Sequence, residues 1–237
     1  MTLQFWGVRG SIPSPANSEN LESKIQAIVN SITPEDLINQ DAKQSFIISL
    51  SDKLTSYVGG NTACVSIQVS DEEIFILDVG TGIRELGKKL PKTIKKIHIF
   101  LTHFHWDHIQ GLPFFDPIFK KDTEIHFYSP DKNLKKFLTF QMSAPFFPVK
   151  FSNCGANFKF HNLELDKSFA ISGVYVKALE ISHPKRAYSY LFNLKNGKKI
   201  LYATDFEISL KDFEDTDENK NFFSNTDIMI IDSQYTA

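Results

Sequence analysis

The feature that most constrains this chain is the run THFHWDH at positions 102–108, which directly follows an apolar, strand-like segment. Side chains alternate in an extended segment, so His103 and His105 point the same way. Asp107 and His108 come next, where the chain is expected to turn into a helix. Because imidazole and carboxylate ligands favour zinc, iron or manganese over calcium, the run predicts a transition-metal site at a strand end.

Further ligands must come from other strand ends. His183 precedes a proline that stops a predicted strand, which makes it the best remote ligand. Asp205 follows another apolar strand, and a carboxylate can bridge two cations. Asp78 and Asp232 also end apolar strands, where an aspartate usually caps a turn or accepts a hydrogen bond from a ligand imidazole, and we predict that role for them. The remaining histidines alternate with apolar residues and are predicted to be packed or surface groups: His98, His126 and His161.

The rest of the chain mixes short strands with helices. Strand signals fall at Leu3–Trp6, Cys64–Val69, Glu73–Val79, Ile97–Leu101, Glu124–Tyr128, Val174–Ile181, Tyr188–Leu194, Lys199–Ala203 and Asp227–Ile231. Helix signals fall at Ile83–Leu90, Asp131–Gln141 and near Thr216–Phe223. Strands and helices do not alternate strictly, so the pattern predicts an α/β (α+β) fold in which two packed mixed sheets are flanked by helices.

Residues 17–56 have a different character, with helical periodicity and polar surroundings. Leu21, Ile25 and Val29 fall on one helical face, and a threonine–proline pair at 33–34 is typical of a helix start. About forty residues seldom hold a core alone. We therefore predict a helical insertion at 17–56 within a single domain that spans residues 1–237.

Charge and cysteine content limit the partners and the compartment. Twenty-six basic and 28 acidic residues give a net charge of −2, which disfavours RNA as a partner without excluding it. Cys64 and Cys154 make no disulfide framework, and the first residues lack the pattern of a signal peptide. No uncharged apolar run approaches the roughly 18 residues of a membrane helix. We expect a cytoplasmic protein with no membrane partner, and a homodimer stays open.

Taken together, the site residues resemble the metallo-β-lactamase-fold hydrolases. Asp78, the HxHxDH run at 103–108, His183 and Asp205 come in the order and with the separations of that superfamily's motifs. The flanking segments are similar to the branch of phosphodiesterases related to tRNase Z and to the enzymes that open cyclic phosphodiesters: GVRGSIP, GGNTACV, LDVGTGIR and IDSQYT. The resemblance covers nearly the whole chain except the insertion.

The resemblance implies a four-layer αββα sandwich with two divalent metal ions, zinc in the first place and manganese or iron as alternatives. It implies that the first ion is held by three histidines and the second by Asp107 and His108, with Asp205 bridging both; the three histidines are His103, His105 and His183. The branch usually supplies a further histidine after the IDSQYT-like motif. This sequence has no histidine after His183, so we expect the second position to be the weaker one.

The function that follows is a metal-dependent hydrolase, foremost a phosphodiesterase that uses a metal-bound hydroxide on a small-molecule or nucleotide phosphodiester, cyclic ones included. Asp107 and Asp205 are its predicted catalytic carboxylates, with Asp107 orienting the hydroxide or receiving its proton. Two alternatives stay open: hydrolysis of an amide, lactam or thioester at the same site, and a catalytically weak metal-binding or sensor module. The aromatic segment at 143–148 could stack a nucleobase or staple the core.

The motif makes a direct prediction about metal content. His103→Ala or His105→Ala should lose most of the first ion, because each removes one of its ligands, whereas His126→Ala should retain it. Elemental analysis of the three purified variants measures this, and equal metal content in all three would refute the assignment.

Overall fold

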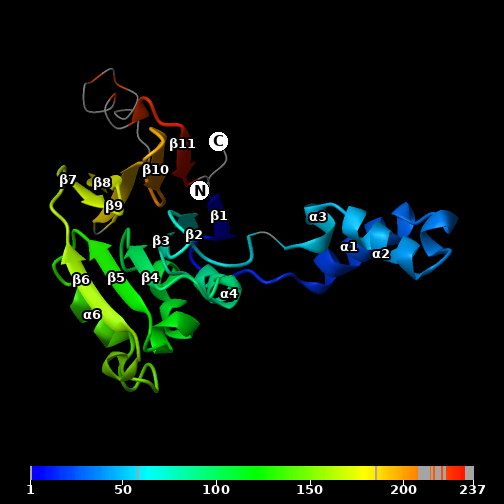
Figure 1. Cartoon of the computed structure of the whole chain (residues 1–237), viewed down its shortest axis with the longest axis horizontal. Coiled ribbons are helices and arrows are strands. Elements are labelled where there is room, and N and C mark those ends of the chain that lie inside the picture. Colours follow the sequence, from blue (N-terminus) through cyan, green and yellow to red (C-terminus); the bar gives the residue numbers. More distant parts are fainter. Residues whose placement is uncertain are drawn as a thin grey trace.

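The computed structural model describes residues 2–57, 59–184, 186–207, 214, 216, 220 and 223–232. Its strands form two mixed sheets that pack face to face (Figure 1), as predicted. The six-stranded sheet runs in the order β1 (Thr2–Gly7), β2 (Cys64–Gln68), β3 (Glu73–Leu77), β4 (Lys96–Phe100), β5 (Glu124–Ser129) and β6 (Asn157–Asn162). The five-stranded sheet runs in the order β11 (Ile228–Ile231), β10 (Lys199–Ala203), β9 (Ala187–Asn193), β8 (Val174–Ile181) and β7 (Ser168–Ile171).

Parallel pairing in the six-stranded sheet brings the carboxyl ends of several strands to the same edge. Strands β3, β4, β5 and β6 are parallel, so their carboxyl ends share one edge, while β2 pairs antiparallel with β3 and β1 pairs antiparallel with β2. In the second sheet β7, β8, β9 and β10 are successive antiparallel neighbours, and β11 pairs parallel to β10.

The alternation of side chains along each strand divides the apolar residues into two cores. Phe75 and Phe100 of the first sheet point between the sheets, where Phe100 packs edge-on against Phe192 of the second sheet with ring centroids 5.1 Å apart. On the opposite face of the first sheet, isoleucines such as Ile76 and Ile99 pack against helices α4 (Gly82–Lys89) and α6 (Leu134–Gln141). Four shorter helical turns connect the strands on this side: α5 (Trp106–Ile109), η2 (Leu112–Phe114), η3 (Asp116–Phe119) and η4 (Phe151–Asn153).

Two strands of the structure were not predicted from the sequence: β6 and β7, whose apolar residues alternate with polar ones over only a few positions. The outer face of the second sheet, with Leu191 and Leu201, packs against Phe206 and Phe223. The helix predicted near Thr216–Phe223 lies mostly outside the described residues.

Residues 18–55 form a helical arm that projects from the body of the molecule (Figure 1). Its elements are α1 (Ser18–Ser31), η1 (Pro34–Leu37), α2 (Gln40–Ser49) and α3 (Asp52–Thr55), and none of them contains a buried residue. The predicted apolar face of α1 is therefore open, with Leu21 and Val29 each 58% exposed. Positions 17–56 carry six acidic and three basic residues, a charge that repels nucleic acid. In the part of the chain that the structure describes, no helix combines the length and apolar character needed to cross a bilayer.

The ends of the arm lie side by side, because the backbone N–H of Ser14 donates to the carbonyl of Gly60 at 2.8 Å. We predict that a short Gly/Ser linker replacing residues 17–56 leaves a folded protein with unchanged metal content. Circular dichroism and elemental analysis would measure fold and metal. Loss of metal from a variant that still folds would mean that the arm contributes to the geometry of the site.

Candidate metal centre

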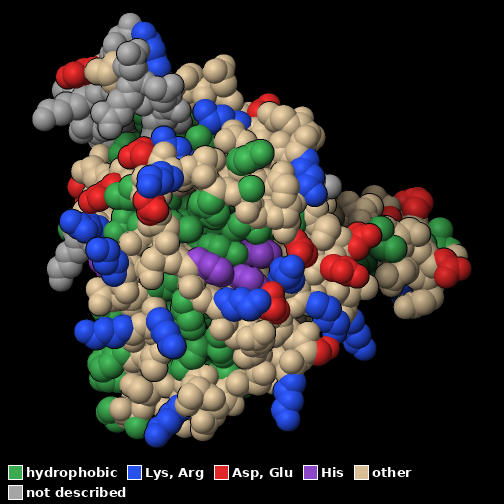
Figure 2. Space-filling view, turned by 60° about the vertical axis from the view of Figure 1, so that its left-hand side comes forward, with side chains coloured by type: hydrophobic (Ala, Val, Ile, Leu, Met, Phe, Trp, Pro, Cys, Tyr) green, Lys and Arg blue, Asp and Glu red, His purple; other side chains and the backbone are tan. Residues whose placement is uncertain are grey.

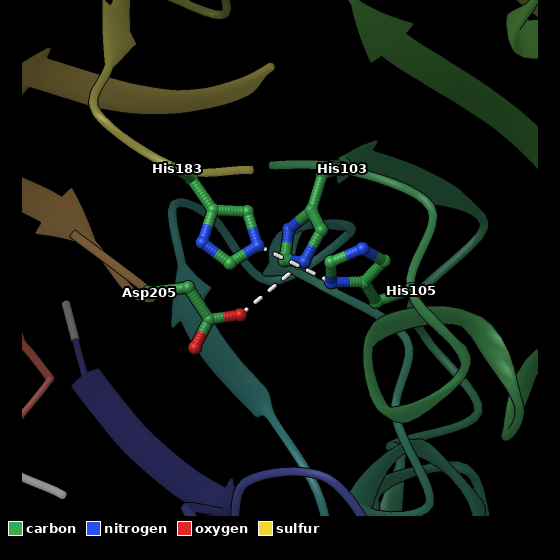
Figure 3. Close-up of side chains that lie close together, drawn as sticks. All are labelled: His103, His105, His183 and Asp205. Carbon is green, nitrogen blue, oxygen red and sulfur yellow. Dashed lines mark hydrogen bonds and ion pairs between the residues drawn. The ribbon is translucent and has the colours of Figure 1, made fainter. Parts of the chain in front are cut away.

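The candidate ligands meet where strands of both sheets end. His103 and His105 follow β4, His183 follows β8, and Asp205 follows β10. Figure 3 shows these four side chains converging from separate parts of the chain. The predicted ligands are thus brought together by the packing of the two sheets, across about 100 residues of sequence.

One group of donors consists of three histidines and a carboxylate. Each of its members offers a ligand atom within 4.8 Å of all the others: His103, His105, His183 and Asp205. His183 Nε2 lies 3.2 Å from His105 Nδ1, and His103 Nε2 lies 3.2 Å from Asp205 Oδ2 (Figure 3). Three imidazoles and one carboxylate make a complete four-coordinate set for a zinc-like ion.

A second group shares Asp205 with the first. Asp107, His108 and Asp205 offer ligand atoms within 4.8 Å of one another. Asp205 Oδ2 lies 2.8 Å from His108 Nε2 as well as 3.2 Å from His103 Nε2. One carboxylate oxygen therefore contacts both groups, which is the position that a bridging ligand needs.

The chemistry of the first group fits a cation. Nε2 of His103 is buried, forms no regular hydrogen bond and lies 3.2 Å from Asp205 Oδ2, so a cation placed beside these two atoms would satisfy both. Burial lowers the pKa of His103 and His183 below the ordinary value for histidine, and burial with the nearby His183 lowers the pKa of His105. These three imidazoles are therefore neutral at physiological pH, with lone pairs ready for a ligand role.

His108 has the opposite electrostatics. Burial lowers its pKa, but the carboxylates of Asp78 and Asp205 outweigh burial and raise that pKa to about 10. Burial raises the pKa of Asp205, yet its contacts with His103 and His108 hold that pKa far below its usual range. Without metal, His108 is a cation between two carboxylates, and an ion at its Nε2 must displace a proton.

Asp78 lies behind His108 and does not belong to either ligand group. It is fully buried, and its Oδ2 accepts from His108 Nδ1 at 2.8 Å and from the Tyr202 hydroxyl at 3.0 Å. The backbone N–H of Thr102 donates to Asp78 Oδ1 at 2.9 Å, and the Thr102 hydroxyl lies 3.0 Å from His103 Nδ1. These contacts fix the orientation of the His108 and His103 imidazoles, and a role for Asp78 in orienting ligands stays a prediction.

Asp107 is fixed by the segment that follows β1. The backbone N–H of Ser11, a residue with φ of 60°, donates to Asp107 Oδ2 at 2.8 Å. Behind the motif, Gly80 and Gly111 allow two backbones to touch: a Cβ at Gly111 would lie 2.1 Å from the Gly80 carbonyl oxygen. The glycine-rich turn after β3 is thus a packing requirement of the site.

The other residues that the sequence analysis considered do not belong to either ligand group. Asp232 lines a cavity of about 790 Å³ together with His108 and Asp205, but it joins neither ligand group. His98, His126 and His161 form a row across β4, β5 and β6, away from the ligand groups. In the aromatic segment, Phe147 packs against the core, and Phe146 is 61% exposed.

Three supporting residues escaped the sequence reading. Thr102 directly precedes His103, so its position beside the motif was a usable signal. Tyr202 lies inside the apolar strand β10, and Ser11 contributes only its backbone N–H, so neither showed a sequence signal.

Comparison with known proteins places these features in context. Residues 75–237 match the family model described as Beta-lactamase superfamily domain. Ribonuclease Z of Pyrococcus horikoshii is 28% identical over 144 residues, which cover 58% of this chain and 44% of that protein. The chain therefore spans less than half the length of this curated relative.

Solved structures show a similar fold at low identity. The metallo-β-lactamase fold protein YhfI from Bacillus subtilis has a TM-score of 0.50 and 16% identity, covering 72% of this chain and 62% of that one. The short form of human tRNase Z has a TM-score of 0.51 and 19% identity, covering 84% of this chain and 67% of that one. These likenesses confirm the predicted fold.

The different protonation of the two groups predicts that they bind metal differently. The group containing His108 should lose its ion first during dialysis against a mild chelator. Because His108 has a pKa of about 10 and must release one proton, affinity at this position should rise roughly 100-fold between about pH 7 and about pH 9. The group of three histidines should change little over that range, because its imidazoles are already neutral.

Competition titrations with a chelating dye at both pH values, together with the metal content after dialysis, measure the two affinities. Two ions released together, with the same pH dependence, would contradict the assignment.

Proposed function

The chain belongs to the β-lactamase superfamily, and on this basis we propose that it is a metal-dependent hydrolase that cleaves phosphodiesters. The observation that carries the proposal is the place of the ligand groups between two cavities. His108 and Asp205 line the cavity of about 790 Å³, and His103 and His105 line a second cavity of about 400 Å³. A phosphodiester carries a substituent on each side of its phosphorus, so each cavity can receive one.

Two dications held by these groups would supply a clamp for the phosphoryl oxygens and would acidify a water molecule. Zinc suits the donors best, because imidazole nitrogens and carboxylate oxygens at tetrahedral sites are typical zinc ligands. The branch-like flanking motifs and the likeness to ribonuclease Z support the choice of a phosphodiester over an amide, lactam or thioester. The fold alone does not discriminate among these substrates.

The protein's own carboxylates carry out the proton chemistry in this proposal. Asp107 is held by the Ser11 N–H at 2.8 Å, so its carboxylate has a fixed orientation toward the space beside His108 and Asp205. We assign Asp107 to orient the attacking water and take up its proton. Asp205 keeps the two ligand groups in register through the single oxygen that contacts both His103 and His108.

We propose a small nucleotide diester, and not a folded RNA, as the substrate. A net charge of −2 and an acidic helical arm disfavour a polynucleotide, which binds through many contacts between its phosphates and basic side chains. A cytoplasmic location and a homodimer remain proposals.

The metal-loaded protein is expected to hydrolyse bis(4-nitrophenyl) phosphate and 2′,3′-cyclic nucleotides faster than it opens the lactam nitrocefin. Asp107→Asn should lower kcat on the diesters by roughly 100-fold or more, because proton transfer is lost, while the first ion stays bound. Steady-state kinetics with parallel metal analysis provide the test. Robust nitrocefin cleavage without turnover of any diester would overturn the proposal, and bound metal with no turnover at all would indicate a binding or sensor module.

A further inference from the structure

We propose that the cavity of about 400 Å³ beside His103 and His105 binds a nucleobase, so that this side of the scissile phosphate carries a nucleoside. We call this cavity the aromatic pocket. The inference rests on the proposed phosphodiesterase function and specifies its substrate class. Its remaining walls come from the motif segment, from α6 and from the start of β9, and their aromatic members are Phe104, Trp106, Phe137, Phe140 and Tyr188.

Two of these aromatic side chains are unusually exposed for their size. Trp106 is 61% exposed and Phe140 is 62% exposed, although both lie next to an apolar cavity. Phe140 also contacts the exposed Phe146, with ring centroids 5.3 Å apart. Figure 2 shows histidine side chains at the surface with hydrophobic side chains adjoining them. Aromatic surface left open beside a reactive centre suits a flat ligand that stacks on it.

The aromatic walls are fixed relative to the candidate metal ligands. The Gln141 side-chain Nε2 donates to the carbonyl of Ile109 at 2.7 Å, which ties α6 to the motif helix α5. The backbone N–H of Tyr188 donates to the carbonyl of Thr102 at 3.0 Å, directly before His103. Phe104 and Phe137 pack edge-on, with ring centroids 5.0 Å apart. A ring bound in the pocket would therefore have a defined position relative to a phosphate at the histidines.

The polar groups at the pocket favour a heterocycle over a purely apolar substituent. Asp131 and Arg186 line the pocket and bring an acceptor and a donor to it. Gln141 also lines the pocket, and its buried Oε1 has no hydrogen-bond partner. Burial and the nearby Asp131 raise the pKa of Tyr188, which keeps its hydroxyl protonated. Nucleobases combine a stacking face with N–H donors and carbonyl acceptors on their edge, which matches this set.

The test compares two esters with the same leaving group: thymidine 5′-(4-nitrophenyl phosphate) and methyl 4-nitrophenyl phosphate. The metal-loaded wild-type protein should prefer the thymidine ester. Phe140→Ala should lower kcat/KM for the thymidine ester by roughly 5- to 30-fold and for the methyl ester by less than about twofold, because only the thymidine ester loses a stacking contact. Phe114→Ala is the matched control, since Phe114 is 57% exposed but does not line the pocket.

A binding measurement separates failure of this inference from failure of the proposed function. Calorimetry with thymidine 5′-monophosphate should show weaker binding to the Phe140→Ala variant than to the Phe114→Ala variant, whether or not either ester is hydrolysed. If neither ester is hydrolysed but this difference appears, the phosphodiesterase proposal fails and the pocket stands. If Phe140→Ala changes both esters equally and leaves nucleotide binding unchanged, the pocket does not bind the base.

Discussion

The buried carboxylate of Asp78 is the interaction on which the site depends. It stands at the end of β3 and joins three separate parts of the chain: Thr102 after β4, His108 in the motif helix, and Tyr202 in the opposite sheet. A fully buried carboxylate is tolerated only when several donors surround it. Asp78 needs these donors in order to be buried. In return, its contacts connect the two sheets at the place where the candidate ligands lie.

The same carboxylate makes the protonation of His108 differ from that of the other candidate ligand histidines. Asp78 and Asp205 hold His108 as a cation in the absence of metal, whereas burial keeps the other candidate ligand imidazoles neutral. Asp78, directly after β3, and Asp205, two residues after the end of β10, both adopt a left-handed backbone conformation, with φ of 57° and 55°. Aspartate tolerates this conformation better than most residues, and it turns each strand end sharply beside the site.

Around this fixed centre the molecule offers two different cavities and an open arm. The larger cavity is lined by the segment after β1 and by the ends of β10 and β11, and the smaller one by aromatic side chains. A diester placed at the candidate ligands would extend into both cavities. The residues that line the cavities would therefore decide the choice of substrate more than the ligands do. The arm adds an exposed apolar face and negative charge.

The sequence by itself determined the fold class and the candidate ligands, because strand alternation, strand-end aspartates and the HxHxDH run are local patterns. It missed β6 and β7, whose short polar alternation is weak, and it could not show that the apolar face of α1 lies open. Only the tertiary structure decided that one oxygen of Asp205 contacts both His103 and His108, and that Tyr202 reaches Asp78 across the sheets. Such contacts join residues about 100 or more positions apart, and their distances depend on how two sheets pack, which no local pattern encodes.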